Sequence, residues 1–398
     1  MSMARSTLRT LVLRYRPVAV ASVVAVAVIS LIPPLDLPER NASEVAPFVD
    51  APVATPPDSV APPRAGGAGT DATGSTVTTS APPVGTLPPP RRPADDGSGA
   101  PAVFARLPSS GAGGIAVAAD GSVVVTLADV DGHGALALFD PGGTLARTLT
   151  LNGGRGLTDV ALRDDATALV LATTPAAVLT VALSSGEVLR SAPVPDVEPC
   201  IPLAREESCD ASSSDQPALP SAVALAPDGA AFVADAGQSA IWRVAPGGGQ
   251  VTQWLNDSAF AARQGPGGPT GLAFDGAGNL VIALPRSLGS DNGSVYLQVV
   301  GPDGGPAERR RLALLGDNAH PTGVVLGITG RIFLPLPDQA SLQLLNNEGG
   351  AVRAIKIAEA LGAGMLGGAA FSDRDVLLAA RDAVVRVPVG ELGGRDAG

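Results

Sequence analysis

Residues 269–283 read Pro269-Thr270-Gly271-Leu272-Ala273-Phe274-Asp275-Gly276-Ala277-Gly278-Asn279-Leu280-Val281-Ile282-Ala283. This stretch joins two short apolar runs through an Asp/Gly/Asn turn, which is the pattern of a β-hairpin. Looser copies of the same pattern recur along the chain, at residues 114–127, 157–172, 220–235, 321–336 and 366–380. The sequence therefore carries six copies of one hairpin.

The spacing of these copies predicts a β-propeller. Counted from the first inward apolar residue of each copy, the successive steps are 45, 63, 49, 52 and 45 residues. A period of about 45 to 50 residues without a helical pattern matches four short strands with their turns, which is one propeller blade. The sixth copy lacks its last strand, and residues 102–107 supply a spare one. We predict an all-β, six-bladed propeller over residues 101–390, closed by pairing of 102–107 with 383–389, because closure removes the open sheet edge.

The first hundred residues differ from the repeats in composition. Residues 36–100 hold 13 prolines among small and polar residues, and their only aromatic residue is Phe48. Such a segment buries too little apolar surface to offset the entropy lost on ordering. We predict that it is a disordered tether.

An apolar run at residues 18–32 precedes this tether. Four arginines and no acidic residue lie ahead of it, and a basic flank favours the cytoplasmic side of a membrane. We predict a cytoplasmic tail over 1–16, a signal anchor or signal peptide over 17–35, and a polar tail over 391–398. The protein is then a single-pass cell-membrane protein with its propeller outside, or a secreted protein if the segment is cleaved.

Two cysteines, Cys200 and Cys209, lie in the insertion that lengthens the step from the second copy to the third. In an oxidising compartment such a pair predicts one disulfide that pins the insertion. Zinc binding is disfavoured because neither a histidine nor a third cysteine lies near them in the sequence.

Composition excludes several function classes. The net charge of −11 repels phosphate backbones, so we predict no nucleic-acid partner. The only lysine is Lys356, which is not part of a phosphate-binding loop. The only histidines, His133 and His320, are too few for a multi-histidine metal site. A glycine-rich match at 362–367 leads into a strand of the repeat, where a dinucleotide site requires a helix. We therefore predict no cofactor.

Two stretches resemble known propeller families. Residues 220–254 and 269–283 are similar to NHL repeats, and residues 232–235 and 240–244 resemble the gluconolactonase (senescence-marker, regucalcin-like) family. The resemblance covers about residues 102–390 and implies the propeller fold. Lactonases of that family hold a divalent cation at the channel mouth through Glu, Asn and Asp at the starts of the innermost strands. The matching positions in this sequence are occupied by Gly113, Gly114, Ser221, Thr270 and Thr322. None of these residues is such a ligand, so we predict no metal.

The residues expected at the channel mouth are polar but carry little charge. They are Asp159, Ser221, Thr270, His320 and Thr322. Small hydroxyls and one carboxylate suit a polar ligand, and the alternative is that they only solvate the channel. His320 could make binding pH-dependent, because an imidazole titrates near pH 6.5; the alternative is an inter-blade hydrogen bond.

Three functions remain open from the sequence. The leading interpretation is a membrane-anchored, extracytoplasmic and non-catalytic module that binds or scaffolds a protein, a glycan or a small polar ligand. The second is a metal-dependent lactonase or esterase with unfamiliar ligands, drawn from Asp159, Asp235, Asp257, Asp317 and Asp338. The third is a lyase acting on cyclic peptides with His320 as its base.

Overall fold

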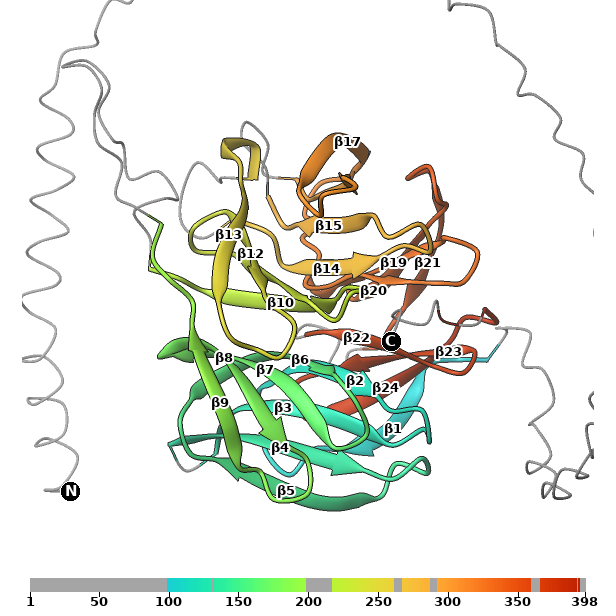
Figure 1. Cartoon of the computed structure of the whole chain (residues 1–398). Coiled ribbons are helices and arrows are strands. Elements are labelled where there is room, and N and C mark those ends of the chain that lie inside the picture. The colour runs from blue at the N-terminus through green and yellow to red at the C-terminus, as the bar shows by residue number, and fades with distance from the viewer. Residues whose placement is uncertain are drawn as a thin grey trace, which may run out of the picture. The chain divides into compact units, whose positions relative to one another are not determined.

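The computed structural model describes residues 99–130, 132–197, 217–260, 267–286, 292–358, 366–391 and 393. All of them belong to one compact unit. Their strands form six four-stranded antiparallel sheets arranged as the blades of a propeller (Figure 1). The predicted all-β, six-bladed fold is confirmed, and the only helical elements of the described part are the short 3-10 helices η2 (Ser258–Phe260) and η3 (Pro337–Gln339).

The blades are numbered along the chain. Blade one comprises β2 (Ala112–Val117), β3 (Val123–Val130), β4 (His133–Phe139) and β5 (Leu145–Leu151). Blade two comprises β6 (Arg155–Leu162), β7 (Thr167–Thr174), β8 (Ala176–Ala182) and β9 (Val188–Pro193). Blade three comprises β10 (Pro220–Leu225), β11 (Ala231–Asp235), β12 (Ala240–Val244) and β13 (Val251–Asn256). Blade four comprises β14 (Gly271–Phe274), β15 (Leu280–Leu284), β16 (Ser294–Val300) and β17 (Pro306–Leu314). Blade five comprises β18 (Val325–Leu326), β19 (Ile332–Leu336), β20 (Ser341–Leu345) and β21 (Ala351–Lys356). Blade six comprises β22 (Ala369–Ser372), β23 (Asp375–Ala379), β24 (Ala383–Pro388) and β1 (Ala102–Arg106).

The ring is closed by its first strand, as predicted. Strand β1 pairs with β24 in an antiparallel register that runs from Ala102 opposite Arg386 to Arg106 opposite Ala383. The Phe104 ring lies under the Arg386 guanidinium at 4.6 Å. Blade six thus takes its outermost strand from the start of the propeller, and β24 has no open edge.

The core lies between neighbouring blades. Alternating apolar residues of each sheet pack against the next sheet, because successive side chains of a strand point to opposite faces. Phe232 of blade three stands edge-on to Phe274 of blade four with ring centroids 5.2 Å apart, and edge-on to Trp254 at 4.8 Å. Phe333 and Phe371 form the corresponding edge-on pair between blades five and six, at 5.2 Å.

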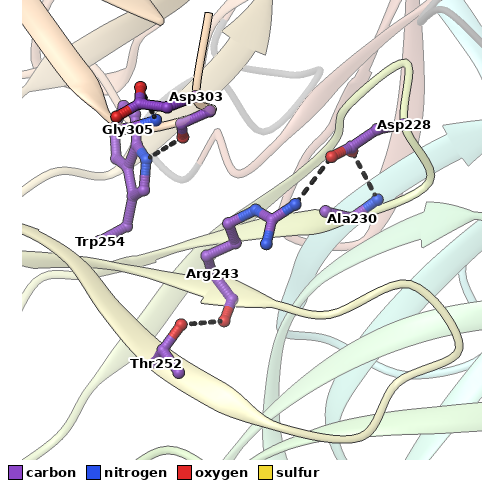
Figure 2. A network of polar contacts seen from close by, with 8 residues as sticks. Asp228, Ala230, Arg243, Thr252, Trp254, Asp303 and Gly305 are labelled. Atoms are coloured by element: carbon purple, nitrogen blue, oxygen red, sulfur yellow. Dashed lines mark hydrogen bonds and ion pairs between the residues drawn. The ribbon is translucent and has the colours of Figure 1, made fainter. Parts of the chain in front are cut away.

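We call the turn between the third and fourth strands of a blade the outer turn. In blades four and one this turn contacts the preceding blade. Trp254 of blade three donates its indole N–H to the Gly304 carbonyl in the outer turn of blade four, at 2.8 Å (Figure 2). Blade one follows the same rule: Gly143 has a φ of 87°, and a Cβ placed on it would lie 2.2 Å from the Phe104 carbonyl oxygen. Only glycine fits so close to a backbone with that conformation.

A short segment after β24 fastens blade six to blade five. Gly393 forms an isolated antiparallel bridge with Gly327, in the turn between the first two strands of blade five. The Glu391 carboxylate, on a side chain only 6 % exposed, accepts hydrogen bonds from the N–H and hydroxyl of Thr329 and pairs with Arg331 at 3.3 Å. Two residues of the predicted tail at 391–398, Glu391 and Gly393, thus contact blade five.

The predicted segments 1–16, 17–35 and most of the tether at 36–100 lie outside the described residues, as do Cys200 and Cys209 with their predicted disulfide. In the described ranges no helix has the length and apolar character needed to cross a bilayer.

Candidate functional site

A cavity of about 1630 Å³ lies on the axis of the ring, where the innermost strands of all six blades line it. Its walls run from the starts of these strands to the turns that link each innermost strand to the second strand, called the inner turns. Asp120, Asp164, Asp165 and Asp373 contribute acidic groups from the inner turns. The channel is therefore continuous with a mainly acidic rim.

Four hydroxyl side chains occupy one position at the starts of consecutive innermost strands. Each donates a hydrogen bond to a backbone carbonyl of the next blade: Thr158 to Pro220 at 2.8 Å, Ser221 to Pro269 at 2.7 Å, Thr270 to Pro321 at 2.7 Å and Thr322 to Gly367 at 3.0 Å. This hydroxyl ring links blades two to six in sequence. Its donors are thus bonded to the fold itself.

Blades six and one carry glycine at the same position. A Cβ on Gly367 would lie 2.2 Å from the Gly113 carbonyl oxygen, so no side chain fits there. A backbone group makes the link between these two blades instead: the N–H of Gly368 donates to that carbonyl at 2.8 Å. In blade one, which has no hydroxyl at this position, the fully buried Thr126 hydroxyl accepts the Gly114 N–H at 2.7 Å. This hydrogen bond lies within the blade. Gly113 and Gly367 thus mark a close approach of blades one and six.

Asp159 lies next to the hydroxyl ring and lines the cavity. Its carboxylate accepts the Val223 N–H of blade three at 2.8 Å. On its other side, a Cβ on Gly114 of blade one would lie 2.1 Å from Asp159 Oδ1. The carboxylate is therefore wedged between the first and third blades, where it accepts a backbone hydrogen bond.

His320 differs from the other four predicted site residues. It is not among the residues that line the cavity. Its Nδ1 lies 2.7 Å from the Asp338 carboxylate in η3, and its side chain is 23 % exposed. The structure brings Asp159, Ser221, Thr270 and Thr322 together at the channel and places His320 in a separate histidine–aspartate pair.

The carboxylates considered as unfamiliar metal ligands do not converge. Within the described ranges no group of three or more His, Cys, Asp or Glu side chains is arranged to hold a metal ion. Each of the five has a different partner: Asp159 the Val223 N–H, Asp235 four donors, Asp257 the Arg309 guanidinium, Asp317 the Asn292 amide and Asp338 the His320 ring.

Asp235 shows how such a carboxylate is used. Its Oδ1 accepts the backbone N–H groups of Leu219, Gly237 and Gln238 at 2.9 to 3.0 Å, and its Oδ2 accepts the Trp242 indole at 3.1 Å. Complete burial raises the pKa of Asp235, while these donors act in the opposite direction. All four donors match the acceptor capacity of an ionised carboxylate.

The same turn fixes both ends of the insertion between blades two and three. Asp235 binds Leu219, where the insertion ends. The buried Gln238 side chain accepts the Val197 N–H and donates to Asp196 at 3.3 Å, where the insertion begins. Residues 198–216 themselves lie outside the described part.

Sequence reasoning missed Thr158 as a member of the hydroxyl ring. It stands two residues before the first inward apolar residue, Val160, as Ser221 stands before Val223. The next residue, Asp159, was predicted in its place because it is the charged residue at that strand start. Applying the same two-residue offset to every copy would have found Thr158.

The fold is shared with solved propellers. The structure is similar to a gluconolactonase from Xanthomonas campestris, with 14% identity, a TM-score of 0.51 and coverage of 75% of this chain and 99% of that one. It is similar to the calcium-binding protein regucalcin from Agrobacterium tumefaciens, with 14% identity, a TM-score of 0.50 and coverage of 74% and 97%. A luciferin-regenerating enzyme matches at 10% identity and a TM-score of 0.51, with coverage of 74% and 97%.

No model of a known protein family matches the chain, and no curated protein matches it in sequence. The structural matches nevertheless confirm the predicted resemblance to gluconolactonase-like and regucalcin-like six-bladed propellers at the level of the fold. Identities this low establish the fold alone, so function has to be argued from the residues of this chain.

Proposed function

We propose that this protein is a non-catalytic binding module, a propeller displayed outside the cell that holds a protein, a glycan or a small polar ligand. One observation carries the proposal: the polar side chains at the channel are hydrogen-bonded to the backbone of neighbouring blades. Thr158, Ser221, Thr270 and Thr322 donate to carbonyls, and Asp159 accepts an N–H. Groups that hold the ring together cannot leave their partners without loosening it.

A lactonase would need a different channel. A hard cation such as calcium requires six to eight oxygen ligands, including carboxylates, to replace its water shell. At the starts of the innermost strands the chain has glycines, hydroxyls and a single carboxylate, and the position equivalent to Thr270 in blade six has no room for a side chain. The large acid-rimmed cavity remains suited to a polar ligand that is bound without being converted.

Metal content tests this proposal. We expect the purified full-length protein to contain no stoichiometric calcium, manganese or zinc, and its melting temperature to be unchanged by a chelator. A metal present at a hundred times its Kd would stabilise the fold by about 2.7 kcal/mol, which is readily measured on heating. Stoichiometric metal that is lost in Asp159→Ala, together with hydrolysis of a lactone, would show that the protein is a lactonase and not a binding module.

One pair of residues favours a second candidate, a lyase or hydrolase with His320 as general base. A carboxylate on Nδ1 orients the imidazole of a general base, and His320 and Asp338 have this arrangement at 2.7 Å. His320→Gln would abolish turnover of cyclic peptides or esters in that case. The binding module instead predicts no turnover by either protein and an equal melting temperature within a few degrees.

Display outside the cell has its own test. Export through the segment at 17–35 would expose Cys200 and Cys209 to an oxidising compartment. We expect mass spectrometry of protein recovered from the membrane or medium to find them disulfide-bonded. Free thiols in that material would argue for a reducing compartment.

A further inference from the structure

The outer turn of blade three is unusually rich in glycine. It contains Gly247, Gly248 and Gly249, of which the first two adopt φ values of 86° and 79°. Gly248 is buried against blade two: a Cβ on it would lie 3.1 Å from Thr180 Oγ1, 3.6 Å from Arg190 Cδ and 3.7 Å from Arg163 Nη1. Two arginines and a hydroxyl of blade two therefore meet at one glycine turn of blade three.

Neither of these arginine side chains has an acceptor in the described part of the chain. No hydrogen bond or ion pair of Arg163 or Arg190 is formed there, and Arg163 Nη2 is shielded from solvent without a hydrogen-bond partner. A shielded guanidinium N–H with no acceptor is costly, and each such group in a folded protein calls for an explanation. Nη2 itself has no room for a ligand, but the Arg163 side chain is half-buried and the Arg190 side chain is exposed, so an anion would bind at their other N–H groups.

The neighbouring junction provides an internal comparison. Arg147 of β5 occupies the position in blade one that Arg190 of β9 occupies in blade two, since each follows the bulge where the outermost strand pairs with the third. Arg147 donates to the Leu183 and Ser184 carbonyls in the outer turn of blade two, at 2.6 and 3.0 Å. Arg190 meets glycines instead, and its donors stay unpaired within the described residues.

The nearest acid does not neutralise this site by a direct contact. Asp164 follows Arg163 in the chain, but its carboxylate accepts the N–H groups of Ala166 and Thr167 and the Thr167 hydroxyl, at 2.7 to 2.9 Å. Asp164 and Arg163 also attract each other through space. Two guanidinium groups beside one turn nevertheless form a local cluster of positive charge, which attracts anions.

We propose that Arg163, Arg190, the Thr180 hydroxyl and the Gly247–Gly249 turn form an oxyanion-binding site at the outer junction of blades two and three. The ligand is a carboxylate, phosphate or sulfate group of a small molecule. Guanidinium forks bind such groups through two parallel N–H···O bonds. The glycines let the ligand approach the backbone without meeting a side chain. Neither arginine lines the channel, although Asp164, the residue after Arg163, does. The anion site therefore goes beyond the function proposed for the channel.

Titration of the full-length protein with sodium phosphate, sulfate and acetate tests the proposal, with sodium chloride holding ionic strength constant. We expect saturable binding of at least one anion, measured by calorimetry, and a rise in melting temperature above the chloride control. Phosphate or sulfate alone identifies a tetrahedral group, whereas acetate identifies a carboxylate.

Variants show whether the binding belongs to this site. Arg163→Gln and Arg190→Gln should each weaken anion binding at least tenfold, and Arg190→Lys should weaken it less, because the charge remains while the fork is lost. Arg147→Gln is the matched control, which should leave binding unchanged. Absence of saturable binding for all three anions, or binding that survives both Arg163→Gln and Arg190→Gln, would overturn the proposal.

Discussion

The channel and the outer junction of blades two and three use polar side chains in opposite ways. Thr270 and its counterparts in the hydroxyl ring donate to carbonyls of the next blade at 2.7 to 3.0 Å. Arg163 and Arg190 also lie where two blades meet, yet they donate to no acceptor in the described part. The difference teaches that a polar residue in a cavity is not thereby a ligand-binding residue. What matters is whether its hydrogen-bonding capacity is already used by the fold.

The largest effect should come from opening the ring, on which both regions depend. Deleting residues 99–108 removes β1, so that β24 loses its backbone partners and Arg386 loses the Phe104 ring. We expect aggregation during purification, because an unpaired strand edge recruits other chains. Size-exclusion chromatography is the measurement. A monomeric truncation with an unchanged urea midpoint would show that the closure is dispensable.

A smaller but still large effect should follow from removing a carboxylate that the fold uses. Asp235→Ala leaves three backbone N–H groups and the Trp242 indole buried without an acceptor, so we expect a loss of about 3 to 5 kcal/mol in the free energy of unfolding. Asp164→Ala, at an exposed turn, is the control and should cost about 1 kcal/mol. Equal losses in urea denaturation would contradict the assigned role of Asp235.

The pH dependence of this difference has a definite sign. Because burial raises the pKa of Asp235 in the folded protein, the native state holds this proton more tightly than the unfolded state. The stability that Asp235 contributes should then fall as pH rises from 3.8 through the folded pKa. Urea titrations across that window should show a larger gap between the parent and Asp235→Ala at the acidic end. A gap that widens toward neutral pH would refute this sign.

Glu391, in the segment after β24, is another carboxylate that the fold uses, at the inner turn of blade five. Glu391→Ala removes the acceptor for Thr329 and Arg331 from a nearly buried position, and we expect it to cost about 2 to 3 kcal/mol. Glu391→Gln keeps an acceptor oxygen and should cost about half as much. If thermal unfolding finds both variants as stable as the parent, the contact between blades five and six carries no energy.

The sequence alone predicted the fold well because its signals are local. Each hairpin copy brings its own turn residues and apolar alternation, so the six blades and the closing strand could be read without knowing any contact. The closing strand was visible as a surplus, because residues 102–107 had no partner in the first blade.

The candidate site was harder to predict because its contacts join distant residues. Ser221 meets Pro269, and Asp235 binds Leu219 and Trp242 in a buried pocket that only the folded chain creates. Arg147 and Arg190 show the limit most clearly. They occupy equivalent strand positions, and what separates them is the turn that the next blade places opposite.

The central claim is that the channel hydroxyls are bonded within the fold, whereas the outer arginines are available to bind an anion. Thermal unfolding of Thr270→Val and Arg190→Gln, each with and without the anion that the parent binds, tests this claim most directly. The account predicts that Thr270→Val loses about 1 kcal/mol of stability and keeps the full anion-induced shift. It predicts that Arg190→Gln unfolds within about 0.5 kcal/mol of the parent and loses the shift. A stable Thr270→Val, or an Arg190→Gln that keeps the anion-induced shift, would contradict it.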